Sequence, residues 1–258
     1  MDIASLRAAM QEKEFYEKIC SVEECESTNL LVRTLALQGA PEGTVVFAGR
    51  QTAGRGRMGR RFQSPGGGGL YMSILLRPAV AAAEIAVITA SAGVAVAEAV
   101  EALCGVPVQI KWVNDLLLGG KKFCGILTES VLSGSESYFL VLGVGINVYT
   151  DFSSFPPEVK KTATSICEAT GRKLSLEQVA AAVLDRFAAF YRGFPENLPE
   201  QHEAYCRRLV TLGQTVEIVG EQGLYTALEV DSRFGLVVEQ EGRRRTLSSG
   251  EVSVRAKG

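Results

Sequence analysis

One stretch of arginine and glycine, residues 50–61, constrains the fold of this chain more than any other segment. It holds five arginines, three glycines and no acidic residue, although the whole chain has a formal net charge of only −2. Apolar, β-branched sequence precedes it at 43–49, and a second apolar run follows at 70–76. Both runs are typical of strands. The fold must therefore suspend a basic loop between two core strands, where functional loops are commonly found.

The composition of this basic loop (residues 50–61) favours binding of a phosphorylated ligand. Glycine lets the backbone approach a ligand closely, and arginine carries a permanent charge on a planar group that suits phosphate and carboxylate. The spacing is neither that of a P-loop nor that of a dinucleotide-binding turn, because no helical run follows. The alternative is an Arg/Gly-rich segment that binds RNA. The ordered sequence on both sides of the loop argues against that alternative.

The bulk composition is that of a globular protein with a substantial core. Of the 258 residues, 47% are apolar and 22% are charged. Nearly balanced charges provide no overall attraction to nucleic acid. The N-terminal residues lack the pattern of a signal peptide, and the most apolar stretch, 79–100, is interrupted by Glu84 and Glu98 and is interpreted as a buried helix. We therefore expect a cytoplasmic protein without a nucleic-acid or membrane partner.

Histidine and cysteine usage excludes several catalytic classes. His202 is the only histidine, so a Ser-His-Asp triad, a Cys-His pair or a histidine-rich metal site is hard to build. We expect His202 to be structural or solvated. The six cysteines show no Cys-x-x-Cys spacing, which predicts reduced thiols and makes a zinc site improbable.

The pattern of elements predicts an α+β fold in two parts. Helices are expected in the first 20 residues and at 30–37, 81–103, 175–194 and 199–209, with Ser27 or Thr28 capping the second. Strands are expected at 43–49, 70–76, 108–112, 116–118, 123–129 and 138–148, and turns at 119–121 and 133–135 indicate hairpins and largely antiparallel pairing. Five short strands after Gly213 predict a small β-barrel. We place the main domain at 1–210 and the barrel at 211–258.

Several polar clusters between residues 27 and 148 carry the most specific information. They are Ser27-Thr28-Asn29, Gly-Arg-Gly-Arg-Met-Gly-Arg at 54–60, Lys111-Trp112-Val113-Asn114-Asp115, Lys122-Phe123-Cys124-Gly125-Ile126-Leu127 and Gly143-Val144-Gly145-Ile146-Asn147-Val148. No cluster is decisive alone. Together and in this order they resemble the catalytic core of the biotin protein ligases, from about residue 22 to the end of the chain. The resemblance implies a class II synthetase-like core, a mixed and largely antiparallel sheet with helices packed on it, followed by an SH3-like barrel.

Three features depart from the family pattern. No winged helix-turn-helix precedes the core, so the chain resembles the monofunctional type and not a ligase that also acts as a repressor. Val113 stands where the family usually has proline. Phe62 occupies a position often held by tryptophan, which leaves less aromatic area to pack on an adenine ring.

The resemblance implies activation of biotin with ATP to biotinyl-5′-AMP, followed by transfer of the biotinyl group to a lysine of a carrier protein. The biotin carboxylate is comparable to a glutamate side chain and is already ionised at neutral pH. The first step therefore needs no general base, which suits a chain with a single histidine. The expected acceptor is the biotin carboxyl carrier domain of an acyl-CoA carboxylase. We expect Mg²⁺ to arrive with the nucleotide, assign no metal ligand, and leave a homodimer as one possible state.

The same resemblance assigns the candidate site residues. Positive charge at the reacting phosphate is expected from the catalytic residues Arg55, Arg57 and Lys122. Biotin binding is assigned to Ser27, Thr28, Asn29, Gln51, Arg55, Gly56, Arg57, Lys122, Gly125 and Gly143, and ATP binding to Arg57, Phe62, Lys111, Asn114 and Asn147. Asp115 is expected to orient Lys111 or to help deprotonate the acceptor lysine. Gly125 and Gly143 either leave room for the bicyclic ring or serve strand geometry, whereas Lys121 is interpreted as exposed and Trp112 as core.

Two rival functions remain open at this point. A lipoate–protein ligase shares the fold and a catalytic lysine, but lipoate lacks the ureido group that Ser27, Thr28, Asn29 and Gln51 would match. An RNA-binding protein would use the basic loop, yet one basic patch without interleaved aromatic residues is a poor RNA platform. For a ligase, we expect the basic loop to be mobile when empty and to close over the adenylate.

Overall fold

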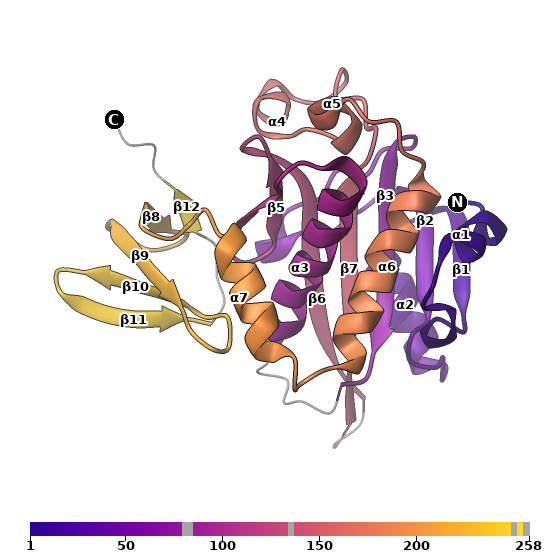
Figure 1. The fold of residues 1–258 in the computed structure, drawn as a ribbon, viewed down its shortest axis with the longest axis horizontal. Helices are drawn as coiled ribbons and strands as arrows, with labels where there is room; N and C mark the ends of the chain where they lie inside the picture. The colour runs from indigo at the N-terminus through magenta and orange to yellow at the C-terminus, as the bar shows by residue number, and fades with distance from the viewer. Residues whose placement is uncertain (79–84, 134–136, 249–251, 255–258) are drawn as a thin grey trace.

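The computed structural model describes residues 1–78, 85–133, 137–248 and 252–254, and its centre is a large mixed sheet (Figure 1). Its seven strands have the order β1-β2-β3-β7-β6-β5-β4. Only β1 and β2 pair in parallel, and the other neighbours are antiparallel, which confirms the predicted fold class. The strands are β1 (Ile19–Cys25), β2 (Val45–Gln51), β3 (Gly69–Leu76), β4 (Gln109–Lys111), β5 (Asp115–Leu118), β6 (Lys121–Ser133) and β7 (Ser137–Asn147).

The described helices follow the predicted ones, with two additions. They are α1 (Ile3–Ala9), α2 (Thr28–Leu37), α3 (Ile85–Cys104), α4 (Pro157–Thr162), α5 (Ile166–Thr170), α6 (Leu176–Arg192) and α7 (Leu198–Arg208). The short α4 and α5 were not predicted. The expected start of α3 at 81–84 and most of the turn at 133–135 lie outside the described residues.

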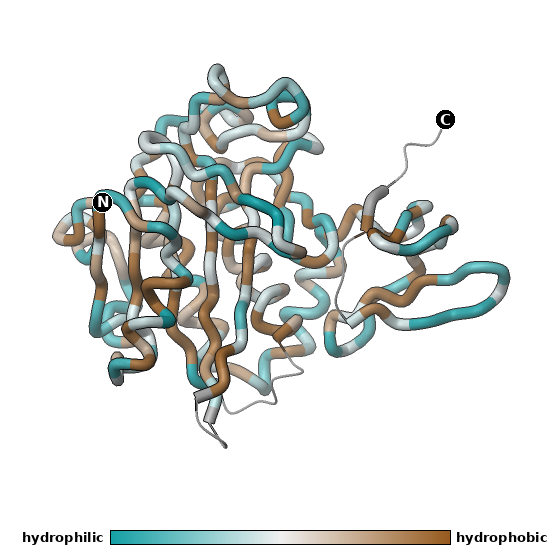
Figure 2. The backbone as a smooth tube through the Cα atoms, turned by 180° about the vertical axis from the view of Figure 1, so that it is seen from behind, coloured by the Kyte–Doolittle hydropathy of each residue, from teal (hydrophilic) through white to brown (hydrophobic). Residues whose placement is uncertain are grey.

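Helices cover the two faces of the sheet unequally. On one face, α3 and α6 pack over the sheet and form the larger core (Figure 1). By length and composition α3 could cross a membrane, but 72% of its most apolar window is buried inside this fold, as in a core helix. On the other face, α2 packs on β2, β3 and β7 around a smaller cluster that includes Val32, Val46 and Phe139. Seen from behind, the strands carry long hydrophobic stretches (Figure 2).

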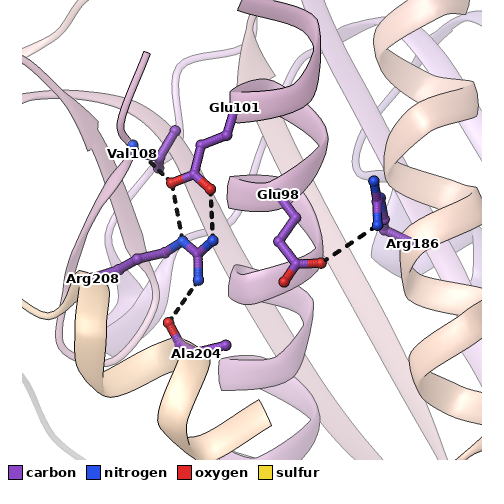
Figure 3. Close-up of polar contacts among 6 residues, drawn as sticks. All are labelled: Glu98, Glu101, Val108, Arg186, Ala204 and Arg208. Atoms are coloured by element: carbon purple, nitrogen blue, oxygen red, sulfur yellow. Dashed lines mark hydrogen bonds and ion pairs between the residues drawn. The ribbon is translucent and has the colours of Figure 1, made fainter. Parts of the chain in front are cut away.

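Ion pairs join the helices of the larger layer (Figure 3). The Arg208 guanidinium of α7 donates to both carboxylate oxygens of Glu101 on α3, at 3.0 and 2.6 Å. The Val108 backbone N–H donates to the same carboxylate at 3.1 Å. Burial alone would raise the pKa of Glu101, but these hydrogen bonds outweigh burial and lower it. A longer pair of 3.9 Å joins Arg186 of α6 to Glu98.

The C-terminal strands form a separate five-stranded sheet that fits an SH3-like domain. The order is β11-β10-β9-β8-β12, from β8 (Thr215–Ile218), β9 (Tyr225–Val230), β10 (Leu236–Gln240), β11 (Arg243–Leu247) and β12 (Val252–Val254). Phe234 anchors this sheet, since its carbonyl accepts from Trp112 Nε1 at 2.9 Å and its ring meets Tyr205 and His202 edge-on. His202 therefore has a structural position, as expected. The boundary at 210 and 211 stays a prediction.

Candidate active site

A cavity of about 150 Å³ opens at the N-terminus of α2, over the middle strands of the large sheet. It collects every residue assigned from the sequence except Asn147. The lining contains Ser27, Thr28, Asn29, Gln51, Arg55, Gly56, Arg57, Phe62, Lys111, Asn114, Asp115, Lys122, Gly125 and Gly143. These residues come from separate segments of the chain, so the fold brings together what the sequence keeps apart.

Glycines keep this part of the sheet free of side chains. Gly125 on β6 lies opposite Gly145 on β7, and Gly143 lies opposite Leu127. A Cβ atom at Gly143 would lie 2.2 Å from Asn29 Oδ1, and one at Gly145 would lie 2.6 Å from the Phe62 ring. Whether Gly143 leaves room for the bicyclic ring or serves strand geometry stays open. The approaching group in this structure is a protein side chain.

The start of α2 is held by side chains and not by the predicted cap. Ser27 occupies the N-cap position, but its side chain makes no capping hydrogen bond, so that prediction is wrong. Instead, the Thr28 backbone N–H and hydroxyl both point to Gln51 Oε1, at 2.9 and 3.2 Å. Gln51 Nε2 in turn donates to Ser64 Oγ at 2.8 Å. The polar residues of α2 and β2 are thereby fixed toward the cavity.

Two residues that the sequence analysis missed hold Asn29 in place. Ser73 Oγ lies 2.6 Å from Asn29 Oδ1 and 2.7 Å from Thr28 Oγ1. Asn29 Nδ2 donates to Glu129 Oε2 at 2.7 Å and lies 3.4 Å from the Leu127 carbonyl. A period-of-two reading of β6 could have found Glu129, because it follows Gly125 and Leu127 on the same face of the strand.

The basic loop folds over the cavity in a defined conformation. It contains the short 3-10 helix η2 (Arg57–Gly59), and Gly56 N–H donates to the Arg60 carbonyl at 2.8 Å. Arg57 Nη1 donates to Asn114 Oδ1 at 3.3 Å, and Arg55 pairs with Glu129 at 3.5 Å. The loop thus presents guanidinium groups to the cavity. Its predicted change between open and closed states stays a prediction.

Lys122 forms a close charged contact in the cavity. Its Nζ lies 2.6 Å from Asp115 Oδ1 and 5.9 Å from the centre of the Phe62 ring. Asp115 was expected to orient Lys111 or to help deprotonate the acceptor lysine. In the structure its carboxylate pairs with Lys122, and both roles stay predictions. Lys111 lies directly opposite Asp115 in the β4–β5 ladder and lines the same cavity.

Asn147 is the assigned residue that lies elsewhere. Its side chain is buried, with Nδ2 donating to the Thr164 carbonyl at 3.3 Å and Oδ1 accepting from Thr150 at 3.3 Å. It therefore fixes the connection after β7 and does not line the cavity.

Some residues line the cavity although the sequence analysis did not select them, among them Arg60, Arg61, Gly145 and Val252. Trp112 also borders it, but is buried as predicted, and the bond from Trp112 to Val113 is cis.

The carboxylates in and beside the cavity are engaged by cations or amides. Asp115 pairs with Lys122, and Glu129 with Asn29 and Arg55. Within the described ranges, no three His, Cys, Asp or Glu side chains come close enough to hold a metal ion.

Known proteins with this pattern share both the sequence and the geometry. Residues 22–147 match the biotin/lipoate A/B protein ligase family. A biotin–[acetyl-CoA-carboxylase] ligase of Mycobacterium tuberculosis is 30% identical over 239 residues, which cover 90% of this chain and 86% of that protein. The bifunctional ligase/repressor BirA of Bacillus subtilis is 41% identical over 168 residues, 65% of this chain, and the match spans about half (52%) of its length.

Solved structures agree over almost the whole chain. Biotin protein ligase from Aquifex aeolicus in complex with biotin and ATP superposes with a TM-score of 0.78 and 31% identity, covering 94% of this chain and 100% of that one. A point mutant of the same ligase in complex with biotin gives a TM-score of 0.79 at 30% identity, with the same coverage. The described cavity thus lies in a fold that holds biotin and ATP in that ligase.

Proposed function

Because this chain belongs to the biotin protein ligase family, we propose that it activates biotin with ATP and transfers the biotinyl group to a lysine of a carrier protein. The observation that carries the proposal is the convergence of all assigned residues except Asn147 on one cavity. The lining combines neutral hydrogen-bonding groups, Thr28 and Asn29 among them, with cationic groups such as Arg57 and Lys122.

The neutral hydrogen-bonding groups suit the ureido ring of biotin, which offers two N–H donors and one carbonyl acceptor. Thr28, Asn29 and Gln51 already lie in a hydrogen-bonded network, so their polar atoms are fixed before a ligand arrives. A fixed polar site discriminates strongly, because an analogue without the matching groups leaves buried protein atoms unpaired. Lipoate has no such ring, and this network therefore favours biotin over lipoate.

The arginine and lysine side chains of the cavity suit the chemistry of adenylation. The ionised biotin carboxylate attacks the α-phosphate of ATP, an oxygen–phosphorus bond forms, and pyrophosphate leaves with its bonding electrons. Positive groups at the meeting point of two anions lower the barrier by stabilising the charge that builds on phosphate. Arg55, Arg57 and Lys122 line the cavity, as does Lys111, which lies opposite Asp115. Mg²⁺ bound to the nucleotide would add positive charge at the phosphates.

In the second step, the amine of an acceptor lysine attacks the carbonyl of the mixed anhydride, and AMP leaves. We propose that the acceptor belongs to the biotin carboxyl carrier domain of an acyl-CoA carboxylase, in line with the names of relatives such as the Mycobacterium tuberculosis ligase. We also propose a cytoplasmic enzyme, either monomeric or homodimeric, with a main domain of 1–210 and a barrel of 211–258. Neither nucleic acid nor membrane has a role in this proposal.

The test is biotin-dependent exchange of labelled pyrophosphate into ATP by the purified protein. We expect exchange with biotin and none with lipoate at the same concentration. Exchange that requires lipoate would replace the biotin assignment with its rival. Salt-sensitive RNA binding without any exchange would instead favour the binding-protein alternative.

A further inference from the structure

Glu129 stands behind the cavity wall and touches two residues of the wall. Its Oε2 accepts from Asn29 Nδ2 at 2.7 Å, and its Oε1 lies 3.5 Å from Arg55 Nη1. Glu129 is not among the residues that line the cavity. Any effect of Glu129 on a ligand must therefore pass through its neighbours.

The Asn29 amide has one possible orientation in these surroundings. A carboxylate only accepts hydrogen bonds, so the NH₂ group must face Glu129. Asn29 Oδ1 then lies on the opposite side, 2.6 Å from Ser73 Oγ and close against the bare backbone of Gly143. A carbonyl oxygen accepts two hydrogen bonds, and Ser73 supplies only one. The second lone pair of Oδ1 is left for a donor in the cavity.

We propose that Glu129 is a positioning residue that makes Asn29 an acceptor for a ureido N–H of biotin. The inference rests on the proposed function, because it assumes that biotin is the ligand. Without Glu129, the amide could turn and present NH₂ to the N–H groups of the ring. Two donors would then face each other, which removes a hydrogen bond and leaves a buried ligand group unpaired.

The contact with Arg55 is the weaker of the two. The Arg55 side chain is 49% exposed and that of Glu129 is 34% exposed, and ion pairs of this kind contribute little. A phosphate or carboxylate of a bound ligand can therefore take Arg55 away from Glu129 while the bond to the almost fully buried Asn29 persists. The Asn29 contact, and not the ion pair, carries the proposed role.

The test is calorimetric titration of the whole protein with biotin, in the absence of nucleotide. Glu129→Ala should weaken biotin binding by about tenfold to a hundredfold, the range for a lost hydrogen bond to a charged group. Glu129→Gln should bind within about threefold of wild type, because its amide oxygen still accepts from Asn29 Nδ2. If Glu129 acted only through its negative charge, Glu129→Gln would lose as much biotin affinity as Glu129→Ala.

A thermodynamic cycle adds a second readout. Asn29→Ala should weaken binding, and Glu129→Ala in that background should weaken it no further. The matched control is Glu24→Ala, which removes a carboxylate paired with Arg50 at 3.1 Å, outside the cavity. It should bind biotin as wild type does.

Three results would overturn the inference: wild-type affinity in Glu129→Ala, equal losses in Glu129→Ala and Glu129→Gln, or additive losses in the double variant. Thermal unfolding of each variant shows whether a loss of binding comes from a folding defect. Glu129→Gln is the variant least exposed to that problem, because glutamine has the size and shape of glutamate. Failure of the proposed function has a different outcome, because the wild type itself would then not bind biotin.

Discussion

Lys122 Nζ on β6 and Asp115 Oδ1 on β5 lie 2.6 Å apart, and both residues line the cavity. The two side chains are 36% and 26% exposed, so the pair is only partly screened by water. This contact holds the ammonium group of Lys122 at the cavity. The position of that charge decides whether it can stabilise the reacting phosphate.

Lys122→Met should slow biotin-dependent pyrophosphate exchange by about a hundredfold, or about 3 kcal/mol of transition-state stabilisation. Methionine is an unbranched side chain only one atom shorter than lysine, and it removes the charge. The control is Lys121→Met, because Lys121 is exposed and does not line the cavity. Equal exchange rates in the two variants would remove Lys122 from the mechanism.

Asp115→Asn should lower the exchange rate by about tenfold while the KM for biotin changes little. The reason is that asparagine no longer holds the ammonium of Lys122 by charge, a change worth about 1.4 kcal/mol in the barrier. Steady-state exchange kinetics at varied biotin separate the two parameters. A large rise in KM with an unchanged rate would show instead that Asp115 serves ligand binding.

The sequence predicted the site because its residues lie in short, distinctive clusters. The basic loop and the apolar runs at 43–49 and 70–76 predicted strands β2 and β3 and the loop between them. Ser73 and Glu129 were missed because their partner, Asn29, is 44 and 100 positions away along the chain. Alternation along β6 puts Glu129 on the same face as Gly125 and Leu127, but the packing of helix α2 against that face is not encoded in any local pattern.

The missed helices have a similar physical reason. Helices α4 and α5 have six and five residues, too few to show a helical period. Ser165 does cap α5, with Glu168 three positions later, and that spacing was an available signal.

Asn147 was assigned to the nucleotide by resemblance, but its amide holds the following connection through Thr150 and Thr164.

Arg57→Gly should increase the rate at which biotinyl-5′-AMP leaves the protein. Arg57 belongs to η2 and donates to Asn114 Oδ1 across the cavity, so its loss removes a charge and a link between the basic loop and the residue before β5. Timed release of labelled adenylate measures the off-rate, and stray biotinylation of other lysines should rise with it. Arg50→Gly is the control, since Arg50 pairs with Glu24 outside the cavity. An unchanged off-rate contradicts the idea of a closing loop.

Gly143→Ala should weaken biotin binding and destabilise the fold by about 1–3 kcal/mol, the usual range for an overpacked site. The new methyl group would lie 2.2 Å from Asn29 Oδ1 and would push that side chain out of place. Gly66→Ala is the matched control, because nothing lies within 4 Å of its added Cβ. Titration with biotin and chemical unfolding of both variants provide the measurements. Wild-type binding by Gly143→Ala would show that Asn29 can move freely.

The ion pair between Glu101 and Arg208 should make stability depend on pH in the acid range. Hydrogen bonds from Arg208 and Val108 outweigh burial and hold the pKa of Glu101 below its ordinary value of 4.5. A carboxylate with a lowered pKa in the folded state stabilises the fold fully above its unfolded-state pKa, and this contribution disappears as the pH falls through the folded-state pKa.

Glu101→Gln should therefore lower the free energy of unfolding by about 2 kcal/mol at pH 7, the size of a charge-assisted hydrogen bond. The difference from wild type should shrink below pH 4.5 and vanish once Glu101 is protonated in the folded protein. Urea unfolding at a series of pH values measures both quantities. Glu98→Gln is the control on the same helix, because its pair with Arg186 is longer, at 3.9 Å, and more exposed. A difference that persists unchanged into acid would assign the effect of Glu101 to side-chain packing and not to its charge.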